Sequence, residues 1–271
     1  MTLKETTTLL RQSGIDSAEY DARELMRHFG NIDAHLITQS TSCDSNAFIQ
    51  AVARRANREP LQYIIGEVCF YREYYTVSPE CLIPRSDTEI LVDYAVKNIP
   101  EGEIFADLCC GSGCIGISTL ANTKNTRCIS VDISDGALEL TRINAFKNNV
   151  IDRTEIRKSD LLNEGIVTEK PLFAILSNPP YIESAVYETL ADEIFHEPKI
   201  AFVGGDDGMI FYERLIPIGL SLIKEDGFLA FEIGYDQADK IHTLAELNGC
   251  TCHIIKDYSG NDRVAVIRKS I

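Results

Sequence analysis

The chain has 271 residues and a mass of 30.2 kDa, and its 45% apolar and 25% charged residues exclude wholesale disorder, coiled coils and collagen-like structure. Its longest apolar runs are as short as Phe173–Leu176, so we expect no segment that spans a bilayer. The net charge of −15 disfavours general binding to nucleic-acid backbones.

The cysteines and the N-terminal residues bear on compartment and metal content. Nine cysteines are an odd number, and a chain of this length can fold without disulfides. The N-terminus shows neither an apolar signal segment nor an acid-free, Arg-rich transit pattern, so we expect a cytoplasmic protein. Because no C-x-x-C pair occurs, we expect small buried thiols and no metal site.

The first sixty residues show helical periodicity. Apolar residues recur at helical spacing over residues 17–30 and 44–58, with Ser17 suited to an N-cap, Gly30 to a stop, and Pro60 ending the second run. This pattern predicts a small helical domain over residues 1–60. The next stretch, Tyr63–Val77, is rich in aromatic and β-branched residues and predicts a β-hairpin within a linker over residues 61–83.

From Pro84 onward the pattern alternates between strand and helix. The expected strands are Ile104–Leu108, Arg127–Val131, Thr154–Arg157, Phe173–Ser177, Phe228–Ile233, Cys252–Asp257 and Arg263–Ile267. The expected helices are Cys114–Ala121, Ala137–Asn148, Met209–Ile223 and Gln237–Leu247. The alternation predicts an α/β fold over residues 84–271, a doubly wound and mostly parallel sheet that binds ligands at the carboxyl ends of its strands. The tight turn at 259–262 predicts that the last two strands pair antiparallel.

A glycine-rich turn follows the first of these strands. Gly111 and Gly113 let the backbone approach a ligand and accept positive φ. The run 111–116 also fits G-x-G-x-x-G, so a dinucleotide site stays open. Against that, Asp107 puts a carboxylate where a pyrophosphate is disfavoured, and it suits a ligand that carries an ammonium or sulfonium group.

Two further acidic residues end strands. Asp132 can accept hydrogen bonds from both hydroxyls of a ribose. Asp160 can accept from an adenine amino group, with Leu161 against the ring, although aspartate is also a common turn residue. Three acidic strand ends with a glycine turn indicate a site for a cationic adenosyl compound, and S-adenosylmethionine fits.

The fourth strand ends in the run Asn178-Pro179-Pro180-Tyr181. The two prolines donate no hydrogen bonds and hold an extended backbone, so nearby carbonyls and the Asn178 side chain can accept both hydrogens of an –NH₂ group. Tyr181 offers a flat face to a planar amide or base. Acceptors beside a trigonal nitrogen stabilise the positive charge that it gains on methylation, and no histidine shows a catalytic arrangement.

These motifs resemble the release-factor glutamine N5-methyltransferases, also called the HemK or PrmC type, over nearly the whole chain. The matching runs are Pro60–Gly66, Leu82–Glu89, Asp107–Gly113, Val131–Ser134, Asn178–Tyr181, Glu197-Pro198, Gly204–Gly208, Phe231–Gly234 and Asp257–Arg263. The sequence departs from the family's usual motifs at two places. Ser86 stands where the family usually has proline, and Cys109-Cys110 stands where it usually has Gly-Thr.

The resemblance implies a seven-stranded class I methyltransferase sheet and transfer of a methyl group from S-adenosylmethionine to the glutamine N5 of the Gly-Gly-Gln motif in peptide chain release factors, with S-adenosylhomocysteine as product. The helical domain would help to hold the substrate, and we expect a monomer. By resemblance, the catalytic residues are Asn178, Pro179 and Tyr181, and Pro180 joins them in binding the substrate. The cofactor residues are Asp107, Cys109, Cys110, Gly111, Ser112, Gly113, Asp132, Asp160, Leu161 and Asn178.

Four other functions compete with this interpretation. A DNA adenine methyltransferase shares Asn178–Tyr181 but should carry a basic recognition region, which this acidic chain lacks. A glutamine methyltransferase for a ribosomal protein differs mainly before the linker. A cofactor-binding module without catalysis does not need Asn178, and an NAD-dependent dehydrogenase leaves Asn178–Tyr181 unexplained.

Overall fold

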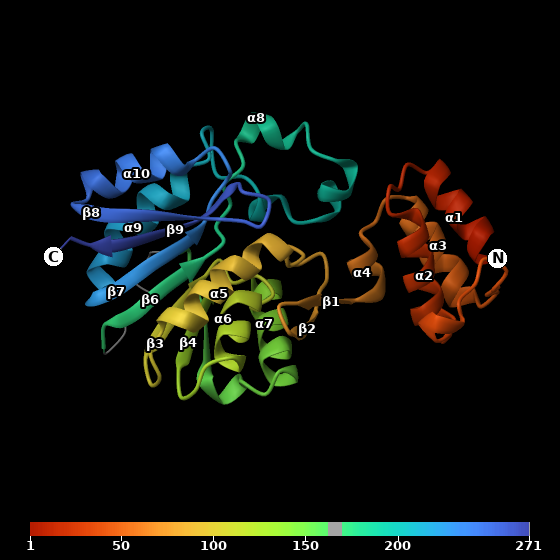
Figure 1. The fold of residues 1–271 in the computed structure, drawn as a ribbon, viewed down its shortest axis with the longest axis horizontal. Helices are drawn as coiled ribbons and strands as arrows, with labels where there is room; N and C mark the ends of the chain where they lie inside the picture. Colours follow the sequence, from red (N-terminus) through yellow and green to blue (C-terminus); the bar gives the residue numbers. More distant parts are fainter. Residues whose placement is uncertain (162–169, 271) are drawn as a thin grey trace. The chain divides into compact units, whose positions relative to one another are not determined.

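The computed structural model describes residues 1–161 and 170–270 (Figure 1). The chain forms two compact units, one of Met1–Glu67 with Ala191–His196 and one of Val68–Leu190 with Glu197–Ile271. We call them the helical unit and the sheet unit. The six-residue segment Ala191–His196 thus belongs to the helical unit, although it lies far along the chain. Within the described residues, no helix is long and apolar enough to cross a membrane.

The helical unit is built from four helices around one apolar core. They are α1 (Leu3–Gln12), α2 (Ala18–Phe29), α3 (Asn46–Ala56) and α4 (Leu61–Ile65). Leu25 and Phe48 are fully buried in this core, as the helical spacing of the apolar residues predicts, and Leu3 of α1, for which no period was predicted, is fully buried there as well. Ser17 and Gly30 flank α2 as predicted, but the Ser17 hydroxyl makes no capping hydrogen bond.

The predicted hairpin over Tyr63–Val77 is too long at its start. Its strands are only β1 (Glu67–Phe70) and β2 (Glu73–Thr76), and residues 63–65 instead close α4. Pro60 precedes that helix, and Gly66 ends it in the left-handed conformation at φ 83°. These two terminators outweigh the strand propensity of the aromatic and β-branched run between them.

The sheet unit contains a seven-stranded sheet in the order β5-β4-β3-β6-β7-β9-β8. Its strands are β3 (Ile104–Leu108), β4 (Arg127–Asp132), β5 (Thr154–Lys158), β6 (Leu172–Ser177), β7 (Ile223–Glu232), β8 (Cys250–Lys256) and β9 (Asp262–Lys269). The first five are parallel, and β9 pairs antiparallel with both β7 and β8. The predicted α/β fold and the antiparallel final pair are therefore confirmed.

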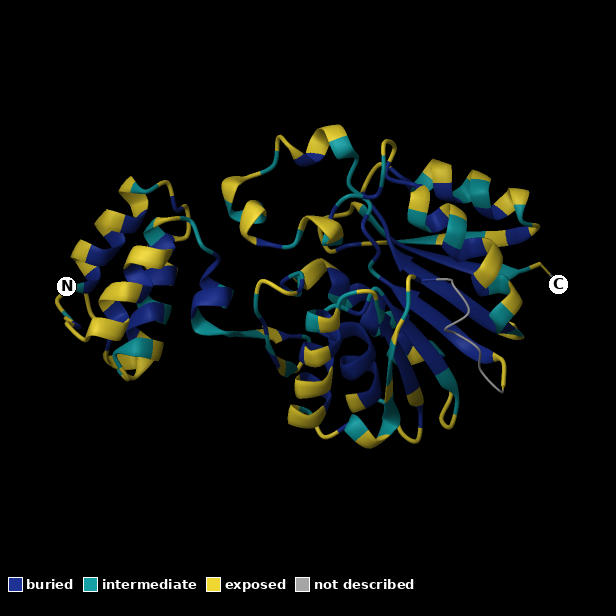
Figure 2. Ribbon diagram, turned by 180° about the vertical axis from the view of Figure 1, so that it is seen from behind, coloured by how far each residue is buried: buried dark blue, intermediate teal, exposed yellow. Residues whose placement is uncertain are grey.

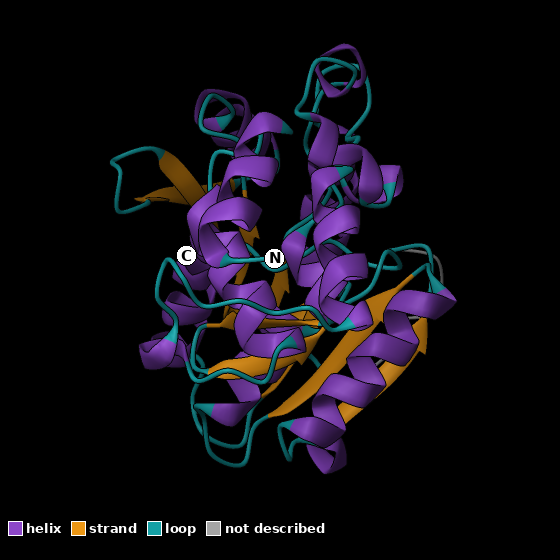
Figure 3. Cartoon of the chain, turned by 90° about the vertical axis from the view of Figure 1, so that its right-hand side faces the viewer, coloured by secondary structure: helices purple, strands orange, loops and turns teal. Residues whose placement is uncertain are grey.

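Helices cover both faces of this sheet, whose strands are largely buried (Figures 2 and 3). The helices of this unit are α5 (Glu89–Asn98), α6 (Cys114–Ala121), α7 (Asp135–Lys147), α8 (Ser184–Tyr187), α9 (Ile210–Leu222) and α10 (Ala238–Leu247), and α8 lies in the segment after β6 and not on a face of the sheet (Figure 1). Residues of α5, α6 and α7 share one core with the hairpin, and residues of α9 and α10 share the other. Along β7, Phe228 and Ala230 enter the first core, whereas Leu229 and Phe231 enter the second, as the two-residue period of a strand requires.

The ends of several elements differ from the predictions. Helix α5 is not among the predicted helices, since three consecutive apolar residues, Ile90-Leu91-Val92, give no clear helical period, and in the structure all three are buried. Ser134 caps α7 by accepting from the backbone of Ala137 at 3.2 Å, so that helix begins at Asp135 rather than Ala137. Strand β7 begins at Ile223, directly after α9, instead of at Phe228.

The strand order determines where a ligand can bind. The chain moves outward from β3 through β4 to β5, and it then crosses back to β6 on the other side of β3. In open α/β sheets such a reversal leaves a crevice beyond the carboxyl ends of the strands. The segments after β3, β4, β5 and β6 therefore meet at one edge, and these are the segments that carry the predicted site residues.

Candidate active site

A cavity with about 1090 Å³ of unfilled volume, including its solvent-open part, lies at this edge of the sheet unit. Nine predicted site residues line it: Cys109, Cys110, Gly111, Ser112, Asp132, Asp160, Leu161, Asn178 and Pro180. They lie at or directly after the carboxyl ends of four different strands. Four other predicted residues are absent from its wall: Asp107, Gly113, Pro179 and Tyr181.

The glycine-rich turn after β3 brings backbone to the cavity. Gly111 and Gly113 have φ of 55° and 79°, so the positive φ expected of these glycines is observed. A Cβ on Gly113 would lie 2.7 Å from the Ile117 side chain, so this glycine also permits close packing beneath the turn. Cys109 has φ 56°, a conformation that a residue with a side chain adopts only at a cost of about 1–2 kcal/mol.

Asp132 is tied to this turn by its carboxylate. One oxygen accepts from the backbone N–H of Gly111 at 2.9 Å, and the other accepts from the N–H of Ser134 at 3.0 Å. Each carboxylate oxygen has a second lone pair, so the group can still accept from a ligand's hydroxyls. Asp132 is half-buried and lines the cavity, which places a fixed pair of acceptors in its wall.

Asp160 and Leu161 follow β5 at the cavity wall. Asp160 is exposed, and its carboxylate lies 3.5 Å from the Arg214 guanidinium. Leu161 is buried, with only 5% of its surface accessible. An exposed polar group beside a buried apolar one can receive the edge and the face of a planar ring.

Asp107 lies beneath the turn rather than in the cavity wall. Its side chain is fully buried, one oxygen accepts from the backbone N–H of Gly116 at 2.9 Å, and the other has no hydrogen-bond partner among the described residues. Burial raises the pKa of Asp107 to about 7, against the lowering effect of that hydrogen bond. Asp107 therefore lies under the turn and does not line the cavity.

Four thiols also line the cavity: Cys81, Cys109, Cys110 and Cys114. Burial raises the pKa of Cys81 to about 12 and moves the pKa of the other three above the ordinary thiol range. Thiols that stay protonated are poor nucleophiles and poor metal ligands. Among the described residues, no group of three or more histidine, cysteine or acidic side chains is arranged to hold a metal ion.

The run after β6 is held in place by its own side chains. Asn178 is half-buried at the wall, and its amide Nδ2 donates to Thr88 Oγ1 at 3.3 Å. The Tyr181 hydroxyl donates to Glu232 at 3.2 Å, and its backbone carbonyl accepts from the Gln237 amide at 3.0 Å. One carbonyl near the prolines is therefore already engaged, and the Tyr181 ring does not line the cavity.

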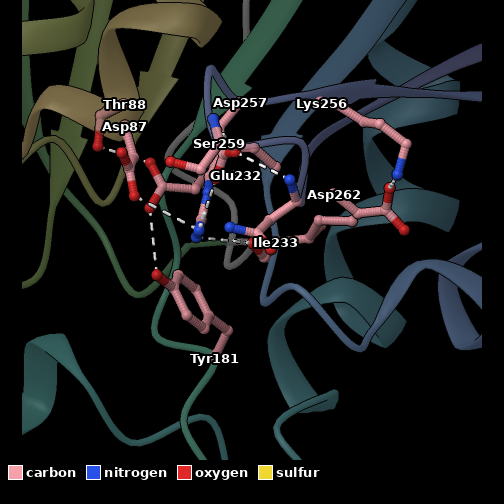
Figure 4. Close-up of polar contacts among 11 residues, drawn as sticks. Asp87, Thr88, Tyr181, Glu232, Ile233, Lys256, Asp257, Ser259 and Asp262 are labelled. Carbon is pink, nitrogen blue, oxygen red and sulfur yellow. Dashed lines mark hydrogen bonds and ion pairs between the residues drawn. The ribbon is translucent and has the colours of Figure 1, made fainter.

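A cluster of polar residues behind this run was not assigned a role from the sequence (Figure 4). The fully enclosed Glu232 carboxylate accepts from Thr88 at 2.6 Å as well as from Tyr181, and burial raises its pKa. Arg263 lies 3.4 Å from Asp87 and 3.2 Å from Asp257. The sequence contains one signal that could have identified these residues: they lie within three of the runs that resemble the family, Leu82–Glu89, Phe231–Gly234 and Asp257–Arg263.

The comparisons with known proteins agree with this arrangement. Residues 2–66 match the family described as PrmC N-terminal domain, and residues 86–212 match the family described as methyltransferase small domain. The release factor glutamine methyltransferase of Clostridium botulinum is 38% identical over 96% of this chain and 95% of its own length. The protein of the same name from Caulobacter vibrioides is 34% identical over 95% of this chain and 91% of its own length.

Solved structures resemble the fold. A ribosomal protein L11 methylase from Lactobacillus delbrueckii has a TM-score of 0.52 and 21% identity, covering 72% of this chain and 84% of its own. Trm5 from Methanocaldococcus jannaschii has the same TM-score at 14% identity, covering 76% of this chain and 56% of its own. At these identities the likeness shows the fold alone. The identity to curated relatives over nearly the full chain is what shows the family: this chain belongs to the release factor glutamine methyltransferases.

Proposed function

We propose that this protein transfers a methyl group from S-adenosylmethionine to the side-chain amide nitrogen, N5, of the glutamine in the Gly-Gly-Gln motif of peptide chain release factors. The product of the cofactor is S-adenosylhomocysteine. The observation that carries the proposal is that Asn178 lines the same cavity as Asp132 and the turn of Gly111. The names of the relatives support release factors as the substrate.

The residues of the cavity fit S-adenosylmethionine. Asp132 would hold the ribose hydroxyls, Asp160 the adenine amino group, and Leu161 the face of the adenine ring. The turn 109–113 would lie along the amino-acid part, where Gly111 leaves room for the backbone to approach.

Asn178 would bind and orient the substrate amide. When bound, S-adenosylmethionine supplies a methyl group that is already electrophilic. The lone pair of an amide nitrogen is delocalised, so acceptors for its N–H bonds raise its electron density and stabilise the charge that it gains. Asn178 Oδ1 is suited to this role because Nδ2 is engaged by Thr88. Pro179 and Pro180 would hold the backbone that carries it, and both are buried.

No general base is needed in this scheme, because a methylated amide that carries positive charge loses its proton readily to water. The chain would need to hold the amide in line with the methyl group, and positioning of that kind accounts for much of the rate. We further propose that the helical unit helps to hold the release factor. Since release factors act on ribosomes, we place the activity in the cytoplasm, and we propose that the protein acts as a monomer.

The test is to locate the methyl group. Purified protein and isotopically labelled S-adenosylmethionine are incubated with release factors, with ribosomal proteins and with DNA, and products are analysed by mass spectrometry. We expect label on the glutamine of Gly-Gly-Gln and none on a release factor in which alanine replaces that glutamine. Label on a ribosomal protein glutamine or on adenine would replace this proposal with one of the alternatives, neither of which the relatives' names favour.

A further inference from the structure

Thr88 connects the proposed substrate-binding amide to a buried carboxylate. Asn178 Nδ2 donates to Thr88 Oγ1 at 3.3 Å, and Thr88 Oγ1 donates to Glu232 Oε2 at 2.6 Å. Thr88 and Glu232 are each only 2% exposed, so water does not compete for the hydrogen bond between these two residues. Figure 4 shows Thr88 and Tyr181 beside the Glu232 carboxylate.

The Glu232 carboxylate determines which group donates in each of these two hydrogen bonds. An ionised carboxylate can only accept, so the single proton of the Thr88 hydroxyl is committed to Glu232. The hydroxyl oxygen is then left with lone pairs alone and must accept from its other neighbour. The Asn178 amide can donate only through Nδ2, and its opposite orientation would set Oδ1 against the Thr88 oxygen.

We propose that Thr88 and Glu232 are positioning residues that fix the orientation of the Asn178 amide, so that Nδ2 faces the protein and Oδ1 is presented to the glutamine N–H. This inference rests on the proposed function, in which Asn178 Oδ1 is an acceptor for the substrate. It gives the same positioning role to Thr88 in the run Leu82–Glu89 and to Glu232 in the run Phe231–Gly234.

The negative charge on Glu232 determines the direction of both hydrogen bonds. Its carboxylate is faced by the hydroxyls of Thr88 and Tyr181, by the Arg263 cation and by Asp87, and Tyr212 donates to its backbone carbonyl. Burial raises its pKa, while the hydrogen bonds and Arg263 act to lower it. When Glu232 is protonated, its O–H can donate to Thr88, which frees the threonine proton to donate to Asn178 and reverses the amide.

Two variants of Thr88 separate orientation from mere packing. Thr88→Val keeps the shape and removes the hydroxyl, whereas Thr88→Ser keeps the hydroxyl. We expect Thr88→Val to lower kcat for release factor methylation about 10- to 100-fold, the scale of a misplaced catalytic contact. Thr88→Ser should restore kcat to within about threefold of the wild type. The dissociation constant of S-adenosylmethionine, measured by calorimetry, should change less than about threefold in both.

The pH profile supplies a readout that a packing role would not move. Wild-type kcat should fall as the pH falls through the Glu232 pKa, because protonation of Glu232 reverses the hydrogen bonds from Asn178 to Thr88 and from Thr88 to Glu232. Glu232→Gln cannot titrate, so kcat should lose this dependence in the acid range. This comparison of wild type with Glu232→Gln tests the inference even if Thr88→Val does not fold.

Each outcome decides the matter. Wild-type turnover in Thr88→Val, a Thr88→Ser variant as slow as Thr88→Val, or an acid limb that persists in Glu232→Gln would overturn the inference while the proposed function stands. A wild-type protein that transfers no methyl to release factors would overturn the proposed function and this inference with it. The decisive experiment is therefore kcat against pH for wild type and the three variants, with cofactor affinity measured on the same preparations.

Discussion

Asn178 and Asp132 lie in the wall of one cavity but have different proposed partners, so their replacements should change different constants. Asn178→Ala removes an acceptor for the amide and should lower turnover about 10²-fold or more, with cofactor affinity nearly intact. Asp132→Ala removes charged acceptors of the ribose and should weaken cofactor binding about tenfold or more in calorimetry. Each variant is the other's control, and the same constant changing in both would contradict the division of roles.

The raised pKa of Asp107 predicts that the free energy of unfolding depends on pH. Its pKa of about 7 in the folded protein lies above the unfolded value of about 3.9. A raised pKa means that the stability present below the unfolded value is lost as the pH rises through about 7. Asp107→Asn does not titrate, so without cofactor it should be more stable than the wild type by roughly 2–4 kcal/mol at pH 8.5 and by about 1.5 kcal/mol or less at pH 5.

Denaturant unfolding at both pH values checks this expectation, with the exposed Asp226→Asn as control. A stability difference independent of pH would rule out the titration of Asp107. Calorimetry with S-adenosylmethionine on Asp107→Asn tests the cofactor role that is predicted for Asp107. Unchanged affinity would confine Asp107 to supporting the turn through its bond to Gly116.

At the scale of the element, the short helix of Ser86–Thr88 offers a site for stabilisation. Ser86 is its first residue and is exposed, and Arg85 before it is extended at φ −107° and ψ 144°. Both conditions suit a proline, which is favoured at the first helical position and needs an extended predecessor. Ser86→Pro should therefore raise the free energy of unfolding by about 0.4–1 kcal/mol, chiefly by restricting the unfolded chain.

Thermal unfolding of Ser86→Pro beside Ser86→Ala checks this, because alanine lacks the ring constraint. A destabilised proline variant would show that the backbone at this position does not match the ring. Since Thr88 ends the same helix, the proline variant should also keep the wild-type kcat.

The elements predicted from the sequence are those with a clear period and clear ends. The strand of Ile104–Leu108 alternates between two cores and ends at a glycine turn, and its predicted bounds are confirmed. The aromatic and β-branched composition of residues 63–65 predicts that they belong to the hairpin, but in the structure they end α4, which Pro60 precedes and Gly66 terminates. The candidate site could be predicted from the residues at the strand ends. Glu232 also ends a strand, but its contact with Thr88 could not be predicted, because these two residues lie 144 positions apart in the chain and meet only once the sheet has formed.

At the scale of the whole molecule, the helical unit depends on a buried ion pair. Arg55 donates to Asp21 at 2.6 Å with both side chains at most 4% exposed, and it also donates to Glu193 at 2.9 Å. Removing one partner of such a pair costs about 3–5 kcal/mol, because the remaining charge stays buried. Arg55→Ala should therefore destabilise the helical unit by that order.

The neighbouring Arg54→Ala is the matched control. Arg54 pairs with Glu59 at the surface, where an ion pair contributes about 1 kcal/mol or less. Hydrogen exchange should show faster exchange in α1, α2 and α3 of Arg55→Ala, with the core strands of the sheet unit unaffected. Equal effects of the two substitutions would contradict the assignment of stability to the buried pair.

The helical unit is assembled from two stretches of chain, Met1–Glu67 and Ala191–His196. A chimera that took only its first 67 residues from a relative would combine foreign helices with a native six-residue segment, and Glu193 would face whatever that relative carries in place of Arg55. Recombination that preserves the unit needs two further crossovers, one on each side of Ala191–His196. The helical unit should therefore be transplanted between relatives as two exchanged pieces, not one.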